Sequence, residues 1–168
     1  MSMGPVLLAL FGLTLGVVTQ ARPEFSGTWI FDPQKTMQPG PDGRVAFAAM
    51  LGDGFIALQD ASSLTLRIRL HGDIVVAVYD LTGAETENVS PGDIRVKSRA
   101  SWDADRLVIL STSDGSENGR PVTITTRRVL WIDVSGDLII DRSGTPASQV
   151  TPTRSVYRRV PGGRKVGL

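Results

Sequence analysis

Residues suited to acid–base or nucleophilic chemistry are few in this chain. His71 is the only histidine among 168 residues, and there is no cysteine. A Ser-His-Asp triad needs its histidine beside an activated serine, and the sequence has no Gly-x-Ser-x-Gly turn to present one. His71 falls on the polar face of a predicted strand beside a turn, so we interpret it as a surface residue. The absence of cysteine excludes disulfides, thiolate nucleophiles and zinc–thiolate sites.

Two pairs of acidic residues are further candidates for chemistry. Asp103 with Asp105, and Glu85 with Glu87, are close carboxylate pairs of the kind that general acid–base catalysis uses. Both pairs fall in segments predicted to be turns, where exposed carboxylates are ordinary. The sequence shows no burial or partner that would tune their pKa values, so we assign them no catalytic role.

One acidic segment has the spacing of a calcium-binding loop. Residues 114–119 carry oxygen-bearing side chains at alternate positions, with glycine in sixth place. The twelfth position is Thr125, where calcium loops have a bidentate glutamate, and the flanking segments have the pattern of strands. We therefore interpret the segment as a hairpin turn. The sequence predicts no catalytic residue, metal site or cofactor, and we expect the protein not to be an enzyme.

Alternation of apolar and polar residues dominates the chain and is typical of β-strands. It is regular in residues 64–71, which we expect to form a hairpin with residues 74–79. The second of these strands is more uniformly apolar, which predicts burial on both faces or a contact with lipid or a partner. The polar segment 80–93 is predicted to be a loop. The predicted strands are 25–32, 55–59, 64–71, 74–79, 94–102, 106–112, 122–134, 138–142 and 153–160.

Short turns between successive strands, with little helix, predict an all-β fold. We expect an antiparallel up-and-down β-barrel of about eight to nine strands, since closure removes unpaired sheet edges. Residues 25–32 are the predicted first strand. Gly27 permits a bend or a close approach of another segment, and Trp29 is placed to plug one end of the barrel.

The N-terminal region has the features of an export signal. Residues 6–18 are an apolar run, and no charge precedes Arg22. The run is shorter than the roughly 20 residues of a membrane span, and a small residue at Ala21 suits cleavage. We expect a signal peptide at 1–21, a barrel domain at 22–160 and a mobile basic tail at 161–168, with no transmembrane span after cleavage. The mature protein is then secreted or periplasmic. The alternatives are an N-terminal membrane anchor or a buried helix.

The charges of the chain nearly cancel. The formal net charge is +1, which gives no strong attraction to nucleic acid, and we expect no nucleic-acid partner. Basic residues recur on the predicted strands, and we interpret them as a solvated outer face unless they converge into a stripe for an anionic partner. They are Arg67, Arg69, Arg95, Lys97, Arg99, Arg127, Arg128, Arg158 and Arg159.

The stretch Phe25-Ser26-Gly27-Thr28-Trp29, followed by Asp32-Pro33-Gln34-Lys35-Thr36, resembles the opening of small secreted bacterial lipocalin-like proteins. Segments 58–66, 78–85, 98–109 and 155–159 resemble the later hairpins and the end of these proteins, in the same order. The resemblance covers nearly all of the chain after residue 21 and implies a lipocalin-like barrel, a class that commonly holds small apolar ligands. It brings no catalytic residues. The alanine-rich segment 46–50 departs from the pattern.

Small residues on the inward face of the strand at 94–102 are predicted to leave room for a ligand inside the barrel. The predicted ligand is a small hydrophobic or amphipathic molecule. The predicted ligand-binding residues are Trp29, Leu66, Val96, Ser98, Ala100, Trp102 and Ile109. The alternative is a barrel filled by its own side chains, acting as a structural or protein-interaction module of the cell envelope. A cavity favours the first reading, and a solid core with an exposed apolar patch favours the second.

Overall fold

A computed structural model describes residues 22–36, 51–70 and 72–161 of the chain. Its elements are β1 (Gly27–Phe31), α1 (Pro33–Thr36), β2 (Gly54–Gln59), β3 (Ser63–Leu70), β4 (Asp73–Asp80), β5 (Glu85–Ser90), β6 (Ile94–Asp103), β7 (Arg106–Glu117), β8 (Arg120–Ile132), β9 (Leu138–Thr145) and β10 (Thr153–Arg159). The ten strands form one antiparallel sheet in the order β4-β3-β2-β1-β10-β9-β8-β7-β6-β5. The prediction of an all-β, up-and-down antiparallel barrel is confirmed, with one strand more than expected.

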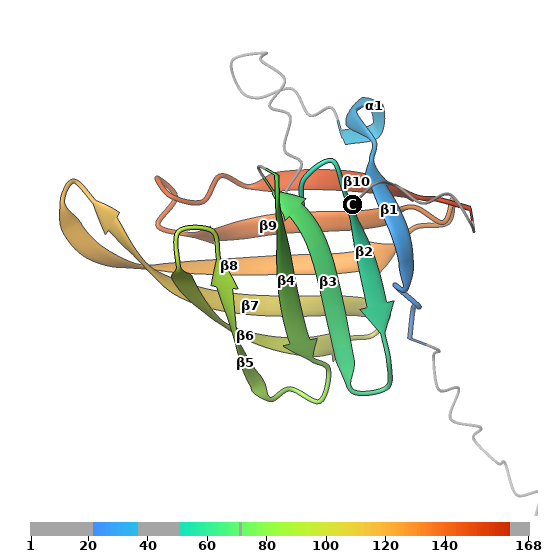
Figure 1. The fold of residues 1–168 in the computed structure, drawn as a ribbon, viewed down its shortest axis with the longest axis horizontal. Coiled ribbons are helices and arrows are strands. Elements are labelled where there is room, and N and C mark those ends of the chain that lie inside the picture. The colour runs from blue at the N-terminus through green and yellow to red at the C-terminus, as the bar shows by residue number, and fades with distance from the viewer. Residues whose placement is uncertain (1–21, 37–50, 71, 162–168) are drawn as a thin grey trace, which may run out of the picture.

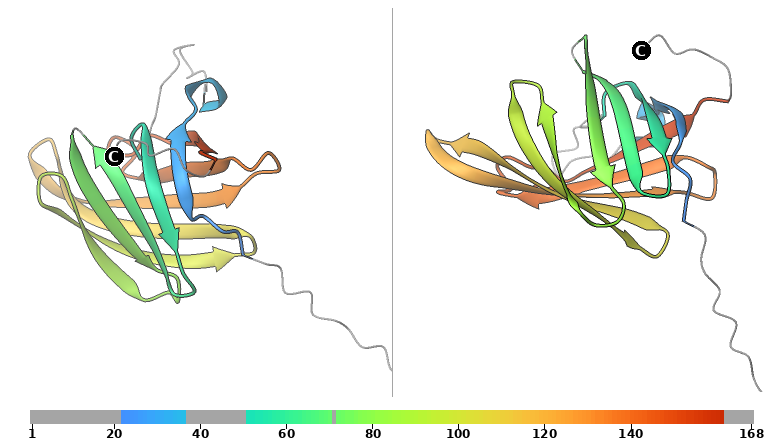
Figure 2. Two further views of the ribbon diagram at one scale, coloured as in Figure 1. Left: turned by 45° about the vertical axis from the view of Figure 1, so that its right-hand side comes forward. Right: turned by 60° about the horizontal axis from the view of Figure 1, so that its bottom comes forward.

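The sheet curls into two layers (Figure 1). Strands β1 to β4 make one layer, and β6 to β10 make the other, with their strands crossing the first; Figure 2 shows the same arrangement from two further sides. Consecutive strands β4 and β5 stand at the two ends of the sheet order. The seam of the barrel therefore lies between these two strands.

The seam is bridged by a side chain. Asn88 of β5 accepts a hydrogen bond from the backbone N–H of Val78 in β4 (2.7 Å), and its amide nitrogen donates to the Val78 carbonyl (3.0 Å). No backbone ladder joins β4 and β5 among the described residues. One asparagine amide thus makes the two contacts that a neighbouring strand would otherwise provide.

Strand β5 lies inside the segment 80–93 that the sequence analysis predicted to be a loop, and that prediction was wrong. Its residues pair with β6 from Glu85↔Arg99 to Ser90↔Ile94. Its inward residues are polar and Val89 is its single apolar residue, so it lacks the apolar alternation that identifies strands. Glu85 and Glu87 accordingly lie in a strand, where they form ion pairs with Arg99 (3.3 Å) and Arg95 (2.6 Å).

The predicted hairpin at 114–119 is present and tighter than expected. Strand β7 continues to Glu117, and only Asn118 and Gly119 form the turn, both with positive φ (52° and 76°). An Asn-Gly pair in this conformation makes the two-residue turn that suits the twist of a β-hairpin. The oxygens of Asp114 and Ser116 therefore belong to an extended strand instead of a loop.

Trp29 lies in the core of the barrel, and the plug role predicted for it remains a prediction. Its side chain is fully buried, and its indole N–H donates to the carbonyl of Phe25 (2.9 Å). The Arg159 guanidinium lies 4.8 Å from the centre of the ring. Gly27 has a φ of 143°, which favours glycine, and a Cβ there would lie 3.7 Å from the Arg159 side chain. The close approach predicted for Gly27 is thus to Arg159 of β10.

The Asp-Pro-x-Lys-Thr segment, residues 32–36, connects β1 to β10 through hydrogen bonds. Asp32 caps α1 by accepting from the N–H groups of Gln34 (3.0 Å) and Lys35 (3.1 Å). Beyond the end of the β1–β10 ladder, the Asp32 N–H donates to the Val156 carbonyl (2.8 Å), and the buried Thr36 hydroxyl accepts from the Val156 N–H (2.9 Å). These contacts extend the ladder by one residue on β10.

Several sequence predictions fall outside the described residues. They concern the signal peptide at 1–21, the alanine-rich segment 46–50, His71 and most of the basic tail. In the described part of the chain, no helix has the length and apolar character of a membrane span.

Candidate ligand site inside the barrel

The inward faces of β6 to β10 change character along each strand. Towards one end of the barrel they carry mainly apolar side chains, and towards the other end they carry mainly polar ones. The apolar set is Ala100, Trp102, Leu107, Ile109, Leu130, Ile132, Leu138, Ile140 and Tyr157. In the strand register, the polar set consists of Ser98, Ser111, Thr126, Arg128, Arg142 and Thr153. The interior is therefore amphipathic from one end to the other.

The structure divides the predicted ligand-binding residues into two groups. Trp29, Leu66, Ser98, Ala100 and Ile109 are each at most 2% exposed. The small side chains of Ser98 and Ala100 are matched by close neighbours: Ser98 shares a 2.9 Å hydrogen bond with Ser111, and Ala100 pairs with Ile109 across the ladder. All five lie in the tightly packed part of the interior, and their contact with a ligand remains a prediction.

Val96 and Trp102 are half-buried and lie at opposite ends of the inward face of β6. Trp102 stacks on Phe25 with ring centres 5.9 Å apart, and its indole N–H has no hydrogen-bond partner among the described residues. Val96 lies at the polar end, opposite Ser113 in β7 and Asn88 in β5. The structure thus does not bring the seven predicted residues together around one space.

Two arginines on the inward face were missed by the sequence analysis. Arg128 lies in β8 two residues before Leu130, and Arg142 lies in β9 two residues after Ile140, so both follow the inward alternation. They are directly opposite each other in the β8–β9 ladder. Arg128 reaches across the interior to β4, where it donates to the Tyr79 hydroxyl (2.8 Å) and lies 5.4 Å from the centre of that ring.

The interpretation of Arg128 as part of the solvated outer face was therefore wrong. Arg127 and Arg128 are adjacent, so a strand must place them on opposite faces, and the buried Leu130 shows which one points inward. This alternation of inward and outward positions can be deduced from the sequence. It was overlooked because the two arginines were treated as one basic patch.

The electrostatics of this arginine pair are unusual. Burial, with the positive charge of Arg128 as a second cause, lowers the pKa of Arg142 from its ordinary value. Neither guanidinium forms an ion pair with a carboxylate among the described residues. The Thr153 hydroxyl, opposite Arg142 in β10, is buried without a hydrogen-bond partner in the same part of the chain. Two facing arginines offer parallel N–H groups that match a carboxylate, sulfate or phosphate.

Several inward residues, the arginine pair among them, keep some accessible surface. They are half-buried and come from five strands: Val75, Val96, Ser113, Ile124, Thr126, Arg128 and Arg142. The set combines aliphatic side chains with two cations and hydroxyl groups. An amphipathic molecule is the kind of ligand that such a surface suits.

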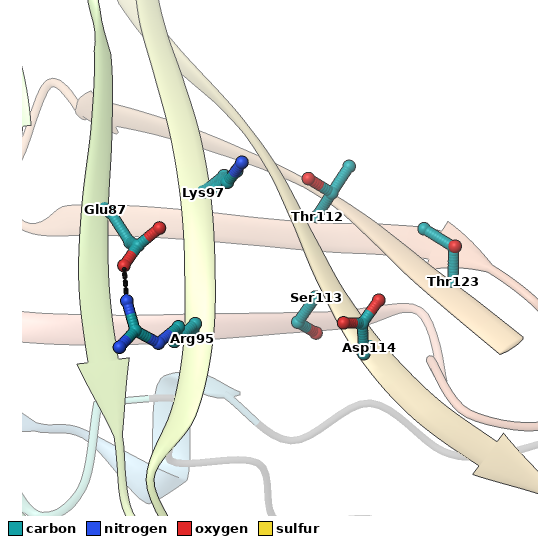
Figure 3. Close-up of a pocket in the computed structure, with 7 residues that line it drawn as sticks. All are labelled: Glu87, Arg95, Lys97, Thr112, Ser113, Asp114 and Thr123. Carbon is teal, nitrogen blue, oxygen red and sulfur yellow. Dashed lines mark hydrogen bonds and ion pairs between the residues drawn. The ribbon is translucent and has the colours of Figure 1, made fainter. Parts of the chain in front are cut away.

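Two grooves on the barrel are more polar. Figure 3 shows one of about 240 Å³ formed by Glu87, Arg95, Lys97, Thr112, Ser113, Asp114 and Thr123, in which Glu87 already pairs with Arg95. The other, of about 380 Å³, is lined by Arg127, Asp141, Arg142, Ser143, Pro152, Thr153 and Arg154. There Asp141 holds Arg154 through two 2.7 Å hydrogen bonds. The second groove borders the arginine pair, because Arg142 and Thr153 belong to both.

Solved structures of similar fold come from lipid-binding proteins. Lipid binding protein 8 of Caenorhabditis elegans has a TM-score of 0.53 and 11% identity, covering 81% of this chain and 95% of that one. Zebrafish ileal bile acid-binding protein, solved with cholic acid, has a TM-score of 0.55 and 14% identity, covering 81% and 98%. The REP1-NXSQ fatty acid transporter has a TM-score of 0.54 and 10% identity, covering 81% and 96%. At identities this low, the similarity shows a shared fold alone.

No protein-family model matches the sequence, and no curated protein matches it. The three structural neighbours are named for binding or transport of small lipophilic molecules, and none for an enzymatic activity.

Proposed function

We propose that this protein is a non-enzymatic carrier that binds a small amphipathic molecule with an anionic group. The observation that carries the proposal is the pair Arg128 and Arg142 on the inward face, without an acidic partner in the described chain. A buried or half-buried charge is normally paired. An anionic headgroup supplies the missing partner, with the Tyr79 hydroxyl as a further contact.

The apolar part of the ligand then lies along Val75, Val96 and Ile124, which are half-buried on the inward faces of β4, β6 and β8. Burial of such surface contributes about 25 cal/mol per Å². The three structural neighbours support the proposal, because their names refer to lipids, a bile acid and fatty acids. A secreted or periplasmic setting is part of the proposal and rests on the apolar run at 6–18.

A matched pair of ligands tests the anionic requirement. Dodecanoate and dodecanol have the same chain length and differ in charge. Isothermal titration calorimetry of the protein should detect dodecanoate binding, with dodecanol clearly weaker. Arg142→Gln should weaken dodecanoate binding by about tenfold or more, because hydrogen bonds to charged groups contribute about 1.5–3 kcal/mol.

Arg127→Gln is the control, because it removes one positive charge from β8 at the position next to Arg128, on the opposite face of that strand. Unchanged dodecanoate affinity is expected for this variant. Equal losses for the two variants, or equal binding of acid and alcohol by the unchanged protein, would contradict a specific role for the arginine pair.

A filled barrel that acts through its surface is the second candidate function. It is favoured by the burial of five predicted ligand-binding residues, each of which is at most 2% exposed. Ala100→Leu tests whether a ligand enters the apolar half of the interior. If a ligand enters the apolar half beside Ala100, the larger side chain blocks it, whereas binding confined to the arginine half survives. Absence of saturable binding by any anionic or neutral amphiphile leaves the filled barrel as the better account.

A further inference from the structure

The outer face of the first layer is unusually apolar. Leu58 of β2 and Ile74, Val76 and Val78 of β4 are between 40% and 54% exposed. Ile56 of β2 is half-buried on the same face. We call these five residues the outer apolar face. The sequence pattern of β4 predicted burial on both sides or a contact with lipid or a partner, and the exposure of three of its residues rules out the first of these among the described residues.

Strand β3 adds cations to the middle of this face. Arg67 lies between Ile56 of β2 and Val76 of β4 in the ladder, and Arg69 is opposite Ile74. Both arginines are exposed, and neither pairs with a carboxylate in the part of the chain that the structure describes. Adjacent strands are about 4.8 Å apart, so each guanidinium stands beside aliphatic side chains.

This combination suits an anionic lipid surface. Aliphatic side chains can enter the boundary between headgroups and acyl chains, while the long arginine side chains keep their charge at the level of the phosphates. A second copy of the chain is a poor occupant. In a twofold contact through this face, Arg67 and Arg69 of each copy would approach their equivalents and repel them.

The position of the face also fits a lipid contact. Strand β4 forms one side of the barrel seam, and Val78 is the residue that Asn88 holds across it. Figure 1 shows β2, β3 and β4 side by side as one layer of the barrel. A lipid surface in contact with β4 therefore lies next to the β4–β5 seam, which is the one boundary between strands of the described sheet that lacks a backbone ladder.

We propose that the outer apolar face, with Arg67 and Arg69, docks the protein onto membranes that contain anionic lipids. This docking does not require the barrel to bind a ligand. Failure of the dodecanoate experiment would leave it standing, and failure of the experiment below would leave the ligand proposal standing.

A single-cysteine probe tests which face contacts lipid, because the chain contains no cysteine. Val76→Cys in the full chain is labelled with the environment-sensitive fluorophore NBD. Leu110→Cys is the matched control, since Leu110 lies on the outer face of β7 and has nearly the same exposure (49%, against 48% for Val76). Vesicles of phosphatidylcholine, with or without phosphatidylglycerol, are then added.

The expected result is a blue shift and an intensity rise at position 76, strongest with phosphatidylglycerol and reduced by salt, with little change at position 110. This comparison remains valid if residues 6–18 anchor the chain, because it reports which face of the barrel meets the lipid. Val78→Cys is a second probe on the same face. It is used if far-UV circular dichroism shows that the first variant does not fold.

Charge variants provide the second part of the test. In the labelled Val76→Cys background, Arg67→Gln and Arg69→Gln should each weaken the response about fivefold, since one basic residue near an anionic surface contributes ~1 kcal/mol. Lys97→Gln with Arg127→Gln removes two charges from the other layer and should leave the response unchanged.

Three outcomes overturn the proposal. Equal responses at positions 76 and 110 mean that the lipid contact is elsewhere. No response at position 76 with a folded protein means that this face does not dock. A response without vesicles that grows with protein concentration identifies a second copy of the chain as the occupant.

Discussion

The Asn88 side chain and the Val78 backbone form a two-point clasp across the seam of the barrel, with hydrogen bonds of 2.7 and 3.0 Å. The amide oxygen accepts from the N–H, and the amide nitrogen donates to the carbonyl. The side chain therefore reproduces the donor and acceptor of a peptide group. The position of β5 relative to β4 depends on this asparagine more than on any ladder in the described residues.

Replacing Asn88 should open the seam locally. Asn88→Leu is expected to lower the free energy of unfolding by about 1–2 kcal/mol, since two partly exposed hydrogen bonds are lost. It should also speed hydrogen exchange at the Val78 amide. Asn88→Asp keeps an acceptor for the Val78 N–H and loses the donor to the Val78 carbonyl. Its free energy of unfolding should therefore lie between those of the wild type and of Asn88→Leu. If the Val78 amide exchanges at the same rate in Asn88→Leu as in the wild type, the Asn88 side chain does not stabilise the seam.

Trp29 should be among the side chains that stability depends on most. Its ring is fully buried and its N–H is bonded to Phe25. Trp29→Ala is expected to cost about 3–5 kcal/mol, a large share of the roughly 5–15 kcal/mol by which domains are stable. Urea unfolding measures the loss.

Trp131→Ala is the control for that change. Trp131 is half-buried on the outward side of β8, and the guanidinium groups of Arg106 and Arg154 lie 4.9 and 5.4 Å from the centre of its ring. Removing it exposes less apolar surface, so the loss should be clearly smaller. A Trp29→Ala midpoint equal to that of the wild type would contradict the plug.

The strands with one apolar face were predictable from sequence, and β5 was not. In β3, Leu64, Leu66 and Ile68 are buried at alternate positions, so hydrophobic period alone identifies the strand. In β5 the inward residues Thr86 and Asn88 are polar, because this strand faces the polar end of the interior and the seam. Its stability comes from pairing with β6 and from Asn88, which no local pattern records.

The arginine pair shows a second limit of sequence reasoning. The parity of Arg128 and Arg142 can be deduced from their apolar neighbours in β8 and β9. Their juxtaposition depends on the register between the two strands, and the contact of Arg128 with Tyr79 depends on curling of the whole sheet. The packing around Ser98 and Ala100 also depends on that curling, so small inward residues alone did not establish a cavity.

Thr36 should matter through its hydroxyl group. The hydroxyl accepts from the Val156 N–H at 2.9 Å in a buried setting. Thr36→Val keeps the shape and leaves this N–H without a partner, which should cost about 1–3 kcal/mol in urea unfolding. Thr36→Ser keeps the acceptor and should lose less. A larger loss for Thr36→Ser than for Thr36→Val would mean that the methyl group, and not the hydrogen bond, is what Thr36 contributes.

Tyr157 should make stability fall at alkaline pH. Its side chain is fully buried, and burial, aided by the charge of Asp53, raises the pKa of its hydroxyl above the ordinary value. The Leu51 N–H donates to this hydroxyl (2.8 Å), which only partly offsets the cost of ionising it. The folded state therefore holds the proton more tightly than the unfolded state, whose tyrosines ionise near pH 10.

The sign of the pH effect follows from that difference. Below about pH 10 both states are protonated and Tyr157 makes its full contribution, whereas above it only the unfolded state releases the proton. Stability should then fall by about 1.4 kcal/mol per pH unit from this residue alone. Urea midpoints between neutral and strongly alkaline pH measure the slope. Tyr157→Phe is less stable at neutral pH because the Leu51 N–H loses its acceptor, but its stability should decline less steeply. Parallel slopes for the two proteins would show that Tyr157 ionises as easily in the folded barrel as in the unfolded chain.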